Sequence, residues 1–254
     1  MSTKVLVISD LHCGSIVGLT PPDYHHLAGD NWQVVEDLWD IYASMVDKLK
    51  PIDVLVVNGD CIDGKSSRTG STDVITAKIF TQIDWASECI DYVGAKNILM
   101  TYGTPYHVGA EEDFEAYLAT AVGADIRSHF FAEIGGVNFS IKHKIGASGI
   151  PHGRHTAIAR EKLWDAEWSI TKKQHPTSNV LIRSHVHYFG FAGNDNWLGI
   201  TTPALQGLGS HYGARMCAGT VDFGVVWFEC EKGGYKWGWD IALPEVQKED
   251  VLKL

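Results

Sequence analysis

Hydrophobic patterning divides the first half of the chain into alternating strands and helices. Short apolar runs cover residues 4–9, 53–58 and 97–102, which predicts three strands that are buried on both faces. Apolar residues recur at helical spacing from Val35 to Leu49, and further helices are predicted over about 73–94 and over 111–123. Asp30 and Gln33 resemble a capping box before the first helix.

The second half of the chain is richer in strands. Residues 127–143 are typical of two strands that meet at Gly135 and Gly136, and a helix is predicted near 155–169. Another apolar strand covers 179–184, and β segments with glycine-rich turns continue to about residue 242. Strands that alternate with helices, followed by antiparallel strands, predict an α/β sandwich of two sheets with helices outside. The sequence contains no evident linker or internal repeat, so we expect one domain over residues 1–254.

Composition narrows the class of protein. The chain is 45% hydrophobic and 20% charged, as is usual for a soluble protein, and its nine tryptophans are expected mostly in the core. A net charge of −10 argues against a surface that grips long nucleic acid. No apolar run is long enough to span a bilayer, and "MSTKVLVISD" lacks the pattern of a signal peptide. The five cysteines lack CxxC spacing, which predicts reduced thiols in a cytoplasm-like compartment.

Four predicted strands run directly into polar motifs: "SDLHCG", "NGDCIDG", "YGTPYHVG" and "RSHVHYFG". Ligands bind beyond the carboxyl ends of parallel strands, so we expect these motifs to surround one crevice. Two motifs carry pairs of residues that are two positions apart and can therefore point to the same side of an extended chain. Carboxylates with imidazoles are typical of a transition-metal site. The candidate residues are Asp10, His12, Asp60, Asp63, His107, His185 and His187.

The order of these motifs resembles that of the calcineurin-like metallophosphoesterases. The family signature is D-x-H, G-D-x-x-D, G-N-H, a single His and G-H-x-H. This chain has Asp10-Leu-His12, Gly59-Asp60-Cys-Ile-Asp63, a loop at Gly103, a candidate single histidine and Ser184-His185-Val-His187. The third motif is a variant that resembles that of some phage and prophage members. The resemblance implies a four-layer α/β/β/α sandwich of two mixed β-sheets flanked by helices, in agreement with the patterning.

The resemblance also implies two divalent transition metal ions, with manganese expected first and iron, zinc or nickel as alternatives. Asp60 would bridge the two ions. One ion would take Asp10, His12 and His187, and the other would take His185 and the single histidine. We expect that histidine to be His143, at the end of the strand "VNFSIKH". His152 and His155, in "PHGRH", are the alternatives.

The resemblance assigns catalytic roles to His107 and Asp63. His107 would contact the phosphate and protonate the leaving oxygen, and the Asp63 carboxylate would hold its imidazole and raise its pKa. The family has a metal-binding asparagine before its histidine, whereas here Thr104 follows the glycine and two residues intervene. We therefore expect the second metal to be held more loosely or to have water as its remaining ligand. Cys13 and Cys61 are expected to face away from the metals.

These features together predict a metal-dependent phosphoesterase that hydrolyses phosphate mono- or diesters through a dinuclear metal centre and a metal-activated hydroxide. Nucleotides or other small phosphoesters are favoured as substrates, and action on nucleic-acid ends remains open. No membrane contact is expected, and the location would be the cytoplasm, or the host cytoplasm if the gene belongs to a phage. The alternative is a catalytically reduced metal-binding or interaction module on the same fold.

Overall fold

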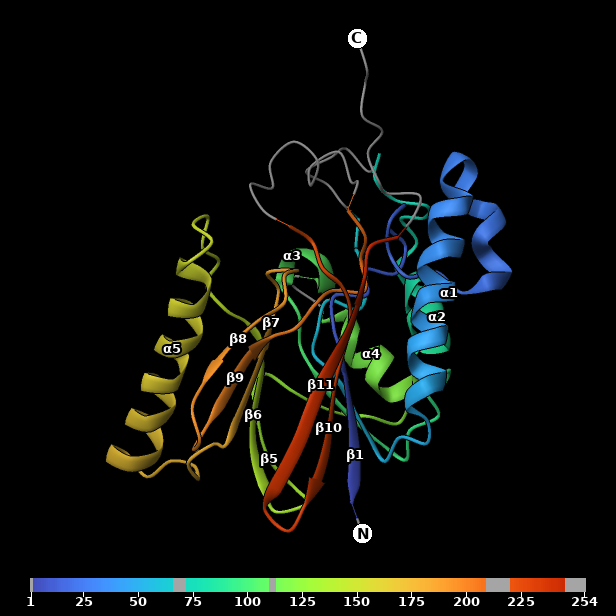
Figure 1. Ribbon diagram of the computed structural model, residues 1–254. Coiled ribbons are helices and arrows are strands. Elements are labelled where there is room, and N and C mark those ends of the chain that lie inside the picture. Colours follow the sequence, from blue (N-terminus) through green and yellow to red (C-terminus); the bar gives the residue numbers. More distant parts are fainter. Residues whose placement is uncertain (1, 66–71, 110–112, 209–219, 245–254) are drawn as a thin grey trace.

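Two β-sheets pack face to face, and helices cover their outer faces (Figure 1). The structure is a computed structural model that describes residues 2–65, 72–109, 113–208 and 220–244. The first sheet has six strands in the order β11 (Gly234–Ala242), β10 (Phe223–Glu231), β1 (Thr3–Ile8), β2 (Val54–Val57), β3 (Asn97–Thr101) and β4 (Asp125–Arg127). The second has five strands in the order β5 (Phe130–Ile134), β6 (Val137–Lys144), β7 (Val180–Ser184), β9 (Leu198–Thr201) and β8 (Gly190–Gly193).

Both sheets are mixed, which confirms the expected α/β fold class. Strands β1 to β4 run parallel, whereas β10 is antiparallel to both β1 and β11. In the second sheet β6, β7 and β9 are parallel, and the outer strands β5 and β8 are antiparallel to their neighbours. The predicted turn between β5 and β6 lies at Gly135 and Gly136, where both φ angles are positive.

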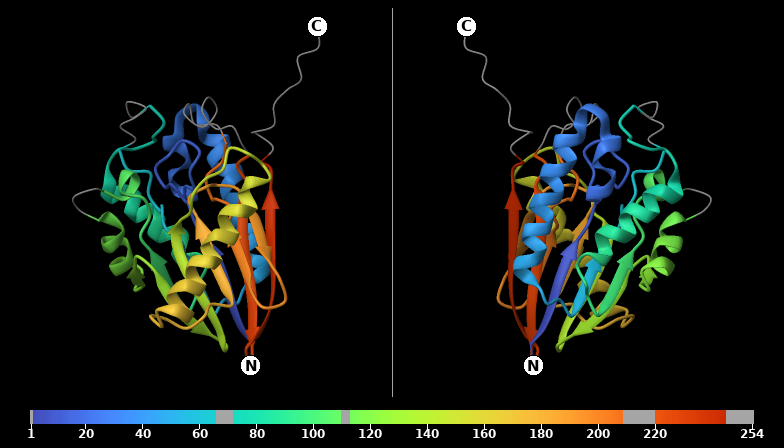
Figure 2. Two further views of the ribbon diagram at one scale, coloured as in Figure 1. Left: turned by 90° about the vertical axis from the view of Figure 1, so that its left-hand side faces the viewer. Right: turned by 90° about the vertical axis from the view of Figure 1, so that its right-hand side faces the viewer.

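The helices form the two outer layers (Figures 1 and 2). The first sheet is covered by α1 (Trp32–Leu49), α2 (Ile79–Asp91) and α4 (Phe114–Ala121). The second is covered by α5 (Gly153–Ala166), which continues as the π-helical turn η3 (Glu167–Thr171). Side chains alternate along β1, so Leu6 and Ile8 pack against the helices while Val5 and Val7 fill the core between the sheets.

Two local expectations were wrong. Helix α1 follows directly from a 3₁₀ helix, η1 (Pro22–Asn31), so its N-cap residue is Asn31 rather than Asp30. Asn31 makes no side-chain cap hydrogen bond, and the expected capping box of Asp30 and Gln33 is therefore not formed. Helix α2 begins at Ile79 rather than near residue 73, because Val74 forms a β-bridge with Ser15 that holds the preceding chain extended.

The tryptophans are also less buried than expected. Only Trp39 and Trp85 are buried, whereas the exposed tryptophans are Trp32, Trp164, Trp168 and Trp239. Large aromatic side chains often keep part of their surface in water, so their number alone is a poor measure of the core.

The four described cysteines, Cys13, Cys61, Cys89 and Cys230, are buried free thiols, and Cys217 lies outside the described residues. Cys13 and Cys61 belong to the core beneath the helices of the first sheet, as expected for residues that face away from a metal. Among the described residues, no helix combines the length and the apolar character that a membrane span requires.

Candidate metal centre

The loops that follow the parallel strands meet at one end of the sandwich, close to the short helix α3 (Pro105–Val108; Figure 1). The loop after β1 is joined to the loop after β2 by backbone hydrogen bonds: Asp10 N donates to Gly59 O at 2.9 Å, and His12 N donates to Asp60 O at 3.1 Å. The first two motifs therefore form one continuous surface rather than two separate loops.

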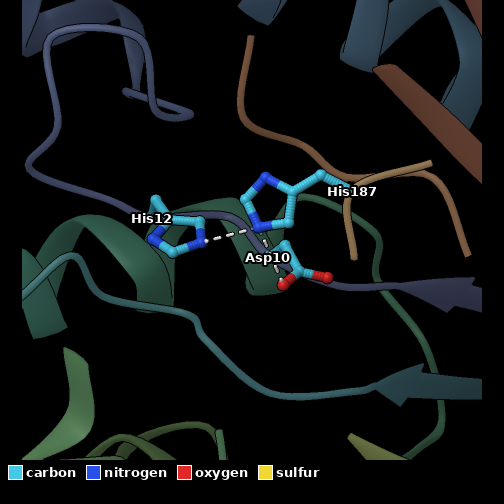
Figure 3. Close-up of side chains that lie close together, drawn as sticks. All are labelled: Asp10, His12 and His187. Atoms are coloured by element: carbon cyan, nitrogen blue, oxygen red, sulfur yellow. Dashed lines mark hydrogen bonds and ion pairs between the residues drawn. The ribbon is translucent and has the colours of Figure 1, made fainter. Parts of the chain in front are cut away.

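One group of possible metal ligands consists of Asp10, His12 and His187. Their ligand atoms lie within 4.8 Å of one another. His12 Nε2 lies 3.3 Å from His187 Nε2, which in turn lies 3.2 Å from Asp10 Oδ1 (Figure 3). The three side chains come from the loops after β1 and β7, so this group connects the two sheets.

A second group consists of Asp60, His143 and His185, and its ligand atoms are again within 4.8 Å of one another. Asp60 Oδ2 lies 3.0 Å from His143 Nε2 and 4.0 Å from His185 Nδ1. Asp60 also forms a third such group with His12 and His107. Asp60 is thus close to ligands of both predicted metal positions.

Hydrogen bonds orient two of the imidazoles toward the centre. His12 Nδ1 lies 3.2 Å from Asp63 Oδ1, and His143 Nδ1 donates to the backbone oxygen of Asn58 at 2.6 Å. A metal-binding histidine is commonly held in this way through its second nitrogen. The Nε2 atoms of both residues therefore point into the centre.

Two buried atoms at the centre suit a divalent cation. Asp10 Oδ1 and His143 Nε2 are buried, and their close polar neighbours are other possible ligands of the centre, His187 Nε2 at 3.2 Å and Asp60 Oδ2 at 3.0 Å. Neither contact has the geometry of a hydrogen bond, although buried polar atoms are normally hydrogen-bonded. A divalent ion accepts both as ligands.

Neighbouring imidazoles lower the pKa of two carboxylates at the centre. Burial alone would raise the pKa of Asp10, but the neighbouring His187 lowers it to about 2. Burial likewise opposes ionisation of Asp60, yet His143 holds the pKa of Asp60 well below its usual value. The Asp60 carboxylate in turn raises the pKa of His143 to about 10, although burial alone would lower it. His143 in its cationic form thus pairs with the Asp60 carboxylate, and a metal ion bound by His143 would displace that proton.

The backbone at the centre is strained. Among the described residues, seven residues other than glycine have positive φ, and five of these are Asp10, His12, Asp60, His185 and His187. Such conformations cost about 1–3 kcal/mol each and persist where the surrounding structure imposes them, often at functional sites. The concentration of strain at the predicted ligands supports a functional centre.

Two glycines allow the loops to approach closely. A Cβ atom on Gly103 would overlap Asp60 Oδ1 and the Asp60 backbone, and one on Gly59 would lie 2.7 Å from His143 Nδ1. Gly59 also has a φ of 80°, which favours glycine. These contacts explain why glycine occupies both motifs.

The variant third motif forms a single helical turn. Pro105 begins α3 and His107 lies within it, so the two additional residues are accommodated as a turn. Thr104 faces Asp60: its backbone nitrogen donates to Asp60 Oδ1 at 2.6 Å, and its hydroxyl lies 3.1 Å from both carboxylate oxygens. The His107 ring packs edge-on against His12, with centroids 4.5 Å apart.

Asp63 acts on the pKa of His107 in the expected direction, but the expected net rise of that pKa is not found. His107 Nδ1 donates to the backbone oxygen of Asp63 at 3.0 Å, whereas the Asp63 carboxylate is 3.7 Å away and lies nearer to His12. The pKa of His107 is lowered, because burial and the adjacent His12 outweigh the attraction of Asp60 and Asp63. Asp63 therefore orients His12 by its carboxylate and His107 by its backbone.

The structure separates the alternatives for the single histidine. His143 is buried beside Asp60, whereas His152 and His155 are exposed at the start of α5. His155 donates through Nδ1 to the backbone oxygen of Phe191, on the outer side of the second sheet. Neither belongs to a group of possible metal ligands among the described residues.

Sequence reasoning missed Glu115, which braces the centre from behind. Glu115 is fully buried in α4, and its two oxygens accept hydrogen bonds from Cys61 N and Gly103 N, each at 2.7 Å. It thereby ties the loop that holds Asp60 to the loop that holds Thr104. The signal in the sequence was an acid that shares a helical face with Leu118 and Ala119.

Sequence reasoning also missed a buried polar chain beneath the ligand loops. Asn58 donates to Ser184 Oγ at 2.6 Å and accepts from Thr101 Oγ1 at 2.7 Å. Ser184 Oγ continues to Thr202 Oγ1 at 2.6 Å, and Thr202 Oγ1 lies 2.7 Å from Ser9 Oγ. Each of these residues ends or follows a strand, so the chain fixes the strand ends of both sheets relative to one another.

Comparison with known proteins agrees with this architecture. Residues 3–206 match the family described as calcineurin-like phosphoesterase. No curated protein is significantly similar to the chain in sequence.

Similar solved structures include a novel archaeal phosphodiesterase, with 16% identity, coverage of 93% of this chain and 99% of that chain, and a TM-score of 0.47. Vacuolar protein sorting 29 from Cryptosporidium parvum has 12% identity, coverage of 95% and 98%, and a TM-score of 0.44. A predicted phosphoesterase from Streptococcus pneumoniae has 11% identity, coverage of 94% and 89%, and a TM-score of 0.42. The family match, which extends from the first strand beyond the last histidine motif, shows that the chain belongs to the calcineurin-like phosphoesterase family.

Proposed function

We propose that this protein is a metal-dependent phosphoesterase that hydrolyses phosphate mono- or diesters at a dinuclear centre. The observation that carries the proposal is the position of Asp60 beside two groups of metal-binding side chains from both sheets. One position would be held by Asp10, His12 and His187, and the other by His143 and His185, with Asp60 shared. Manganese is the first candidate, and iron, zinc or nickel would suit the same ligands.

Two divalent ions bound here would neutralise the charge of a phosphate and lower the pKa of a water molecule between them. The chain's own residues would hold and orient these groups. Asp63 and Asn58 keep Nε2 of His12 and His143 directed at the centre, and Glu115 fixes the loops on either side of Asp60.

His107 is positioned to handle a proton. Its Nδ1 is engaged by the Asp63 backbone, which leaves Nε2 as the reactive nitrogen. The imidazole has a lowered pKa without substrate, and an arriving phosphate anion would raise it. His107 would then gain a proton with the substrate and pass it to the leaving oxygen.

A cavity beside the centre favours small phosphoesters. It has a volume of about 500 Å³, shares His143 with the centre and is lined by Tyr102, Ser128, Lys142 and Lys144 among others. This volume lies in the usual range for small-molecule sites. The lining has two lysines against one acid, Asp113, which suits an anionic substrate such as a nucleotide, and the net charge of −10 for the chain disfavours long nucleic acid.

Turnover of p-nitrophenyl phosphate and bis-p-nitrophenyl phosphate, on chelator-treated protein with and without added manganese, tests the proposal. We expect turnover of at least one ester that depends on the metal, and the preferred ester separates monoesterase from diesterase. If the protein binds two ions but hydrolyses both esters only at the background rate, with and without metal, the result would favour a metal-binding module with little catalytic activity. The observation that motivates this second candidate is Thr104, which offers a hydroxyl where the family signature has an amide.

A further inference from the structure

Strand β11 leaves a long open edge on the first sheet. It is nine residues long and lies at the outer margin of the molecule, where the two views of Figure 2 show it in red. Within the part of the chain that the structure describes, it pairs with β10 alone. Open edges of this length pair readily with another strand, and natural proteins usually shorten or cover them.

The register of the β10–β11 hairpin determines which backbone groups are free. Glu231 and Gly234 flank the two-residue loop and form a hydrogen-bonded pair, so even-numbered residues of β11 bond to β10. Consistently, the backbone oxygen of Asp240 faces Gly224 on β10. Odd-numbered residues, from Tyr235 to Ile241, therefore direct their N–H and C=O groups outward.

Apolar side chains surround this edge. Phe191, Trp239 and Ile241 are 44%, 45% and 39% exposed. The rings of Trp237 and Trp239 lie 5.3 Å apart, and those of Phe191 and Trp239 lie 5.9 Å apart. We call Phe191, Trp237, Trp239 and Ile241 the β11 edge patch. A contiguous exposed apolar patch beside unpaired backbone groups is typical of a protein interface.

The charges on β11 identify the partner. We propose that a second copy of this chain pairs with β11 in antiparallel orientation about Gly238, to form a two-fold symmetric dimer with a continuous sheet. In this register Lys236 lies opposite the partner's Asp240, and the symmetry repeats the ion pair. Trp237 lies opposite the partner's Trp239 on the other face, and Tyr235 opposite the partner's Ile241.

The backbone and the side chains select the same register. Pairing about Gly238 makes Trp237 and the partner's Trp239 a hydrogen-bonded pair, which uses the outward N–H and C=O groups. Pairing about Trp239 would also satisfy the backbone, but it would place Lys236 opposite the partner's Ala242 and leave both charges unpaired. Within the hairpin, Lys236 lies opposite Glu229. The partner's Asp240 would be a second acid beside Lys236, so the three side chains would form a charge triplet.

Sedimentation velocity from low to high micromolar concentration, with charge-reversal variants, tests this proposal. We expect the natural chain to form a concentration-dependent dimer. Lys236→Glu and Asp240→Lys should each weaken dimerisation by roughly tenfold or more, because each variant opposes like charges twice per dimer. The double variant Lys236→Glu/Asp240→Lys should recover the dimer, since it restores opposite charges. Lys48→Glu, on α1, is the matched control and should behave as the natural chain does.

A natural chain that stays monomeric at every concentration would overturn the proposal. So would single variants that dimerise as well as the natural chain, or a double variant no better than either single one. Urea unfolding of each variant at low concentration verifies that the monomer remains folded. These outcomes do not depend on phosphoesterase activity.

Discussion

His12 Nε2 and His187 Nε2 lie 3.3 Å apart, although 175 positions separate the two residues in the chain. Two imidazole nitrogens at this distance either share one proton or bind one cation. Asp63 engages the other nitrogen of His12, and Asp10 Oδ1 lies 3.2 Å from His187 Nε2. The three side chains, supplied by a loop from each sheet, could therefore hold one ion.

Asp60→Asn should reduce phosphoesterase turnover nearly to background. The substitution removes the charge of the carboxylate that lies between both ligand groups, so it weakens both metal positions. Turnover and metal content after gel filtration measure the effect. Asp47→Asn, an exposed site on α1, makes the same chemical change as a control. Full metal content with normal turnover in Asp60→Asn would contradict the shared position of Asp60.

His107→Ala should lower turnover by roughly 10²–10⁴-fold and leave most of the metal bound, because its proposed role is proton transfer or phosphate contact. Steady-state kinetics and metal analysis of the same sample distinguish the roles. His155→Ala, which alters an exposed histidine on α5, serves as the control. Loss of metal in His107→Ala would instead make His107 a ligand, in the group it forms with His12 and Asp60.

The ion nearer His185 should dissociate before its partner. Thr104 has a side-chain hydroxyl where the family signature has an amide oxygen, so this position has fewer strong ligands than the position with Asp10, His12 and His187. A chelator titration followed by metal analysis should show two steps, with activity lost in the first. Thr104→Asn should move the first step to higher chelator concentration, because residue 104 faces Asp60. A single step for the natural chain would contradict unequal sites.

Glu115→Gln should lower the free energy of unfolding and slow turnover, although the side chain at position 115 lies behind the centre and does not contact the substrate. An amide nitrogen would face either Cys61 N–H or Gly103 N–H, so one buried hydrogen bond is lost at a cost of about 1–3 kcal/mol. Urea unfolding and kcat measure the two effects. Glu167→Gln, on an exposed turn, is the control. A Glu115 variant with unchanged stability would show that these hydrogen bonds do not brace the loops.

Stability should fall as the pH falls from about 6.5 to 4, in part because of His129. Burial, reinforced by Arg183, lowers the pKa of His129 from its ordinary value of 6.5 to about 4. The unfolded chain therefore binds a proton in this window that the folded chain does not, which favours unfolding. His129→Gln can keep a hydrogen bond to Ser140 and should lose less stability between pH 7 and pH 5. Urea unfolding of the metal-free proteins measures the difference, and equal losses would contradict this origin.

Much of the fold could be predicted from the sequence, because each layer follows from a local pattern. The apolar runs before Asp10 and Asp60 became parallel strands, and Gly135-Gly136 became the expected hairpin turn. The start of α2 was wrong because Val74 pairs with Ser15, a residue distant in sequence. A contact of that kind leaves no periodicity to detect.

The site was predicted less completely than the fold. Histidine and aspartate at strand ends indicated the possible ligands, because parallel strands bring their ends together. The partner of His107 could not be predicted, since the choice between the backbone and the carboxylate of Asp63 depends on the turn of α3. Glu115 shares a helical face with Leu118 and Ala119, but the sequence does not show which backbone N–H groups such an acid binds, so its role was missed.

We propose that two metal ions share Asp60 between the ligand groups from the two sheets. Anomalous diffraction at the manganese edge, from crystals of the manganese-loaded protein, tests it directly. We expect two peaks on either side of the Asp60 carboxylate, one contacted by His12 and His187 and the other by His143 and His185. A single peak, or peaks that Asp60 does not contact, would contradict it.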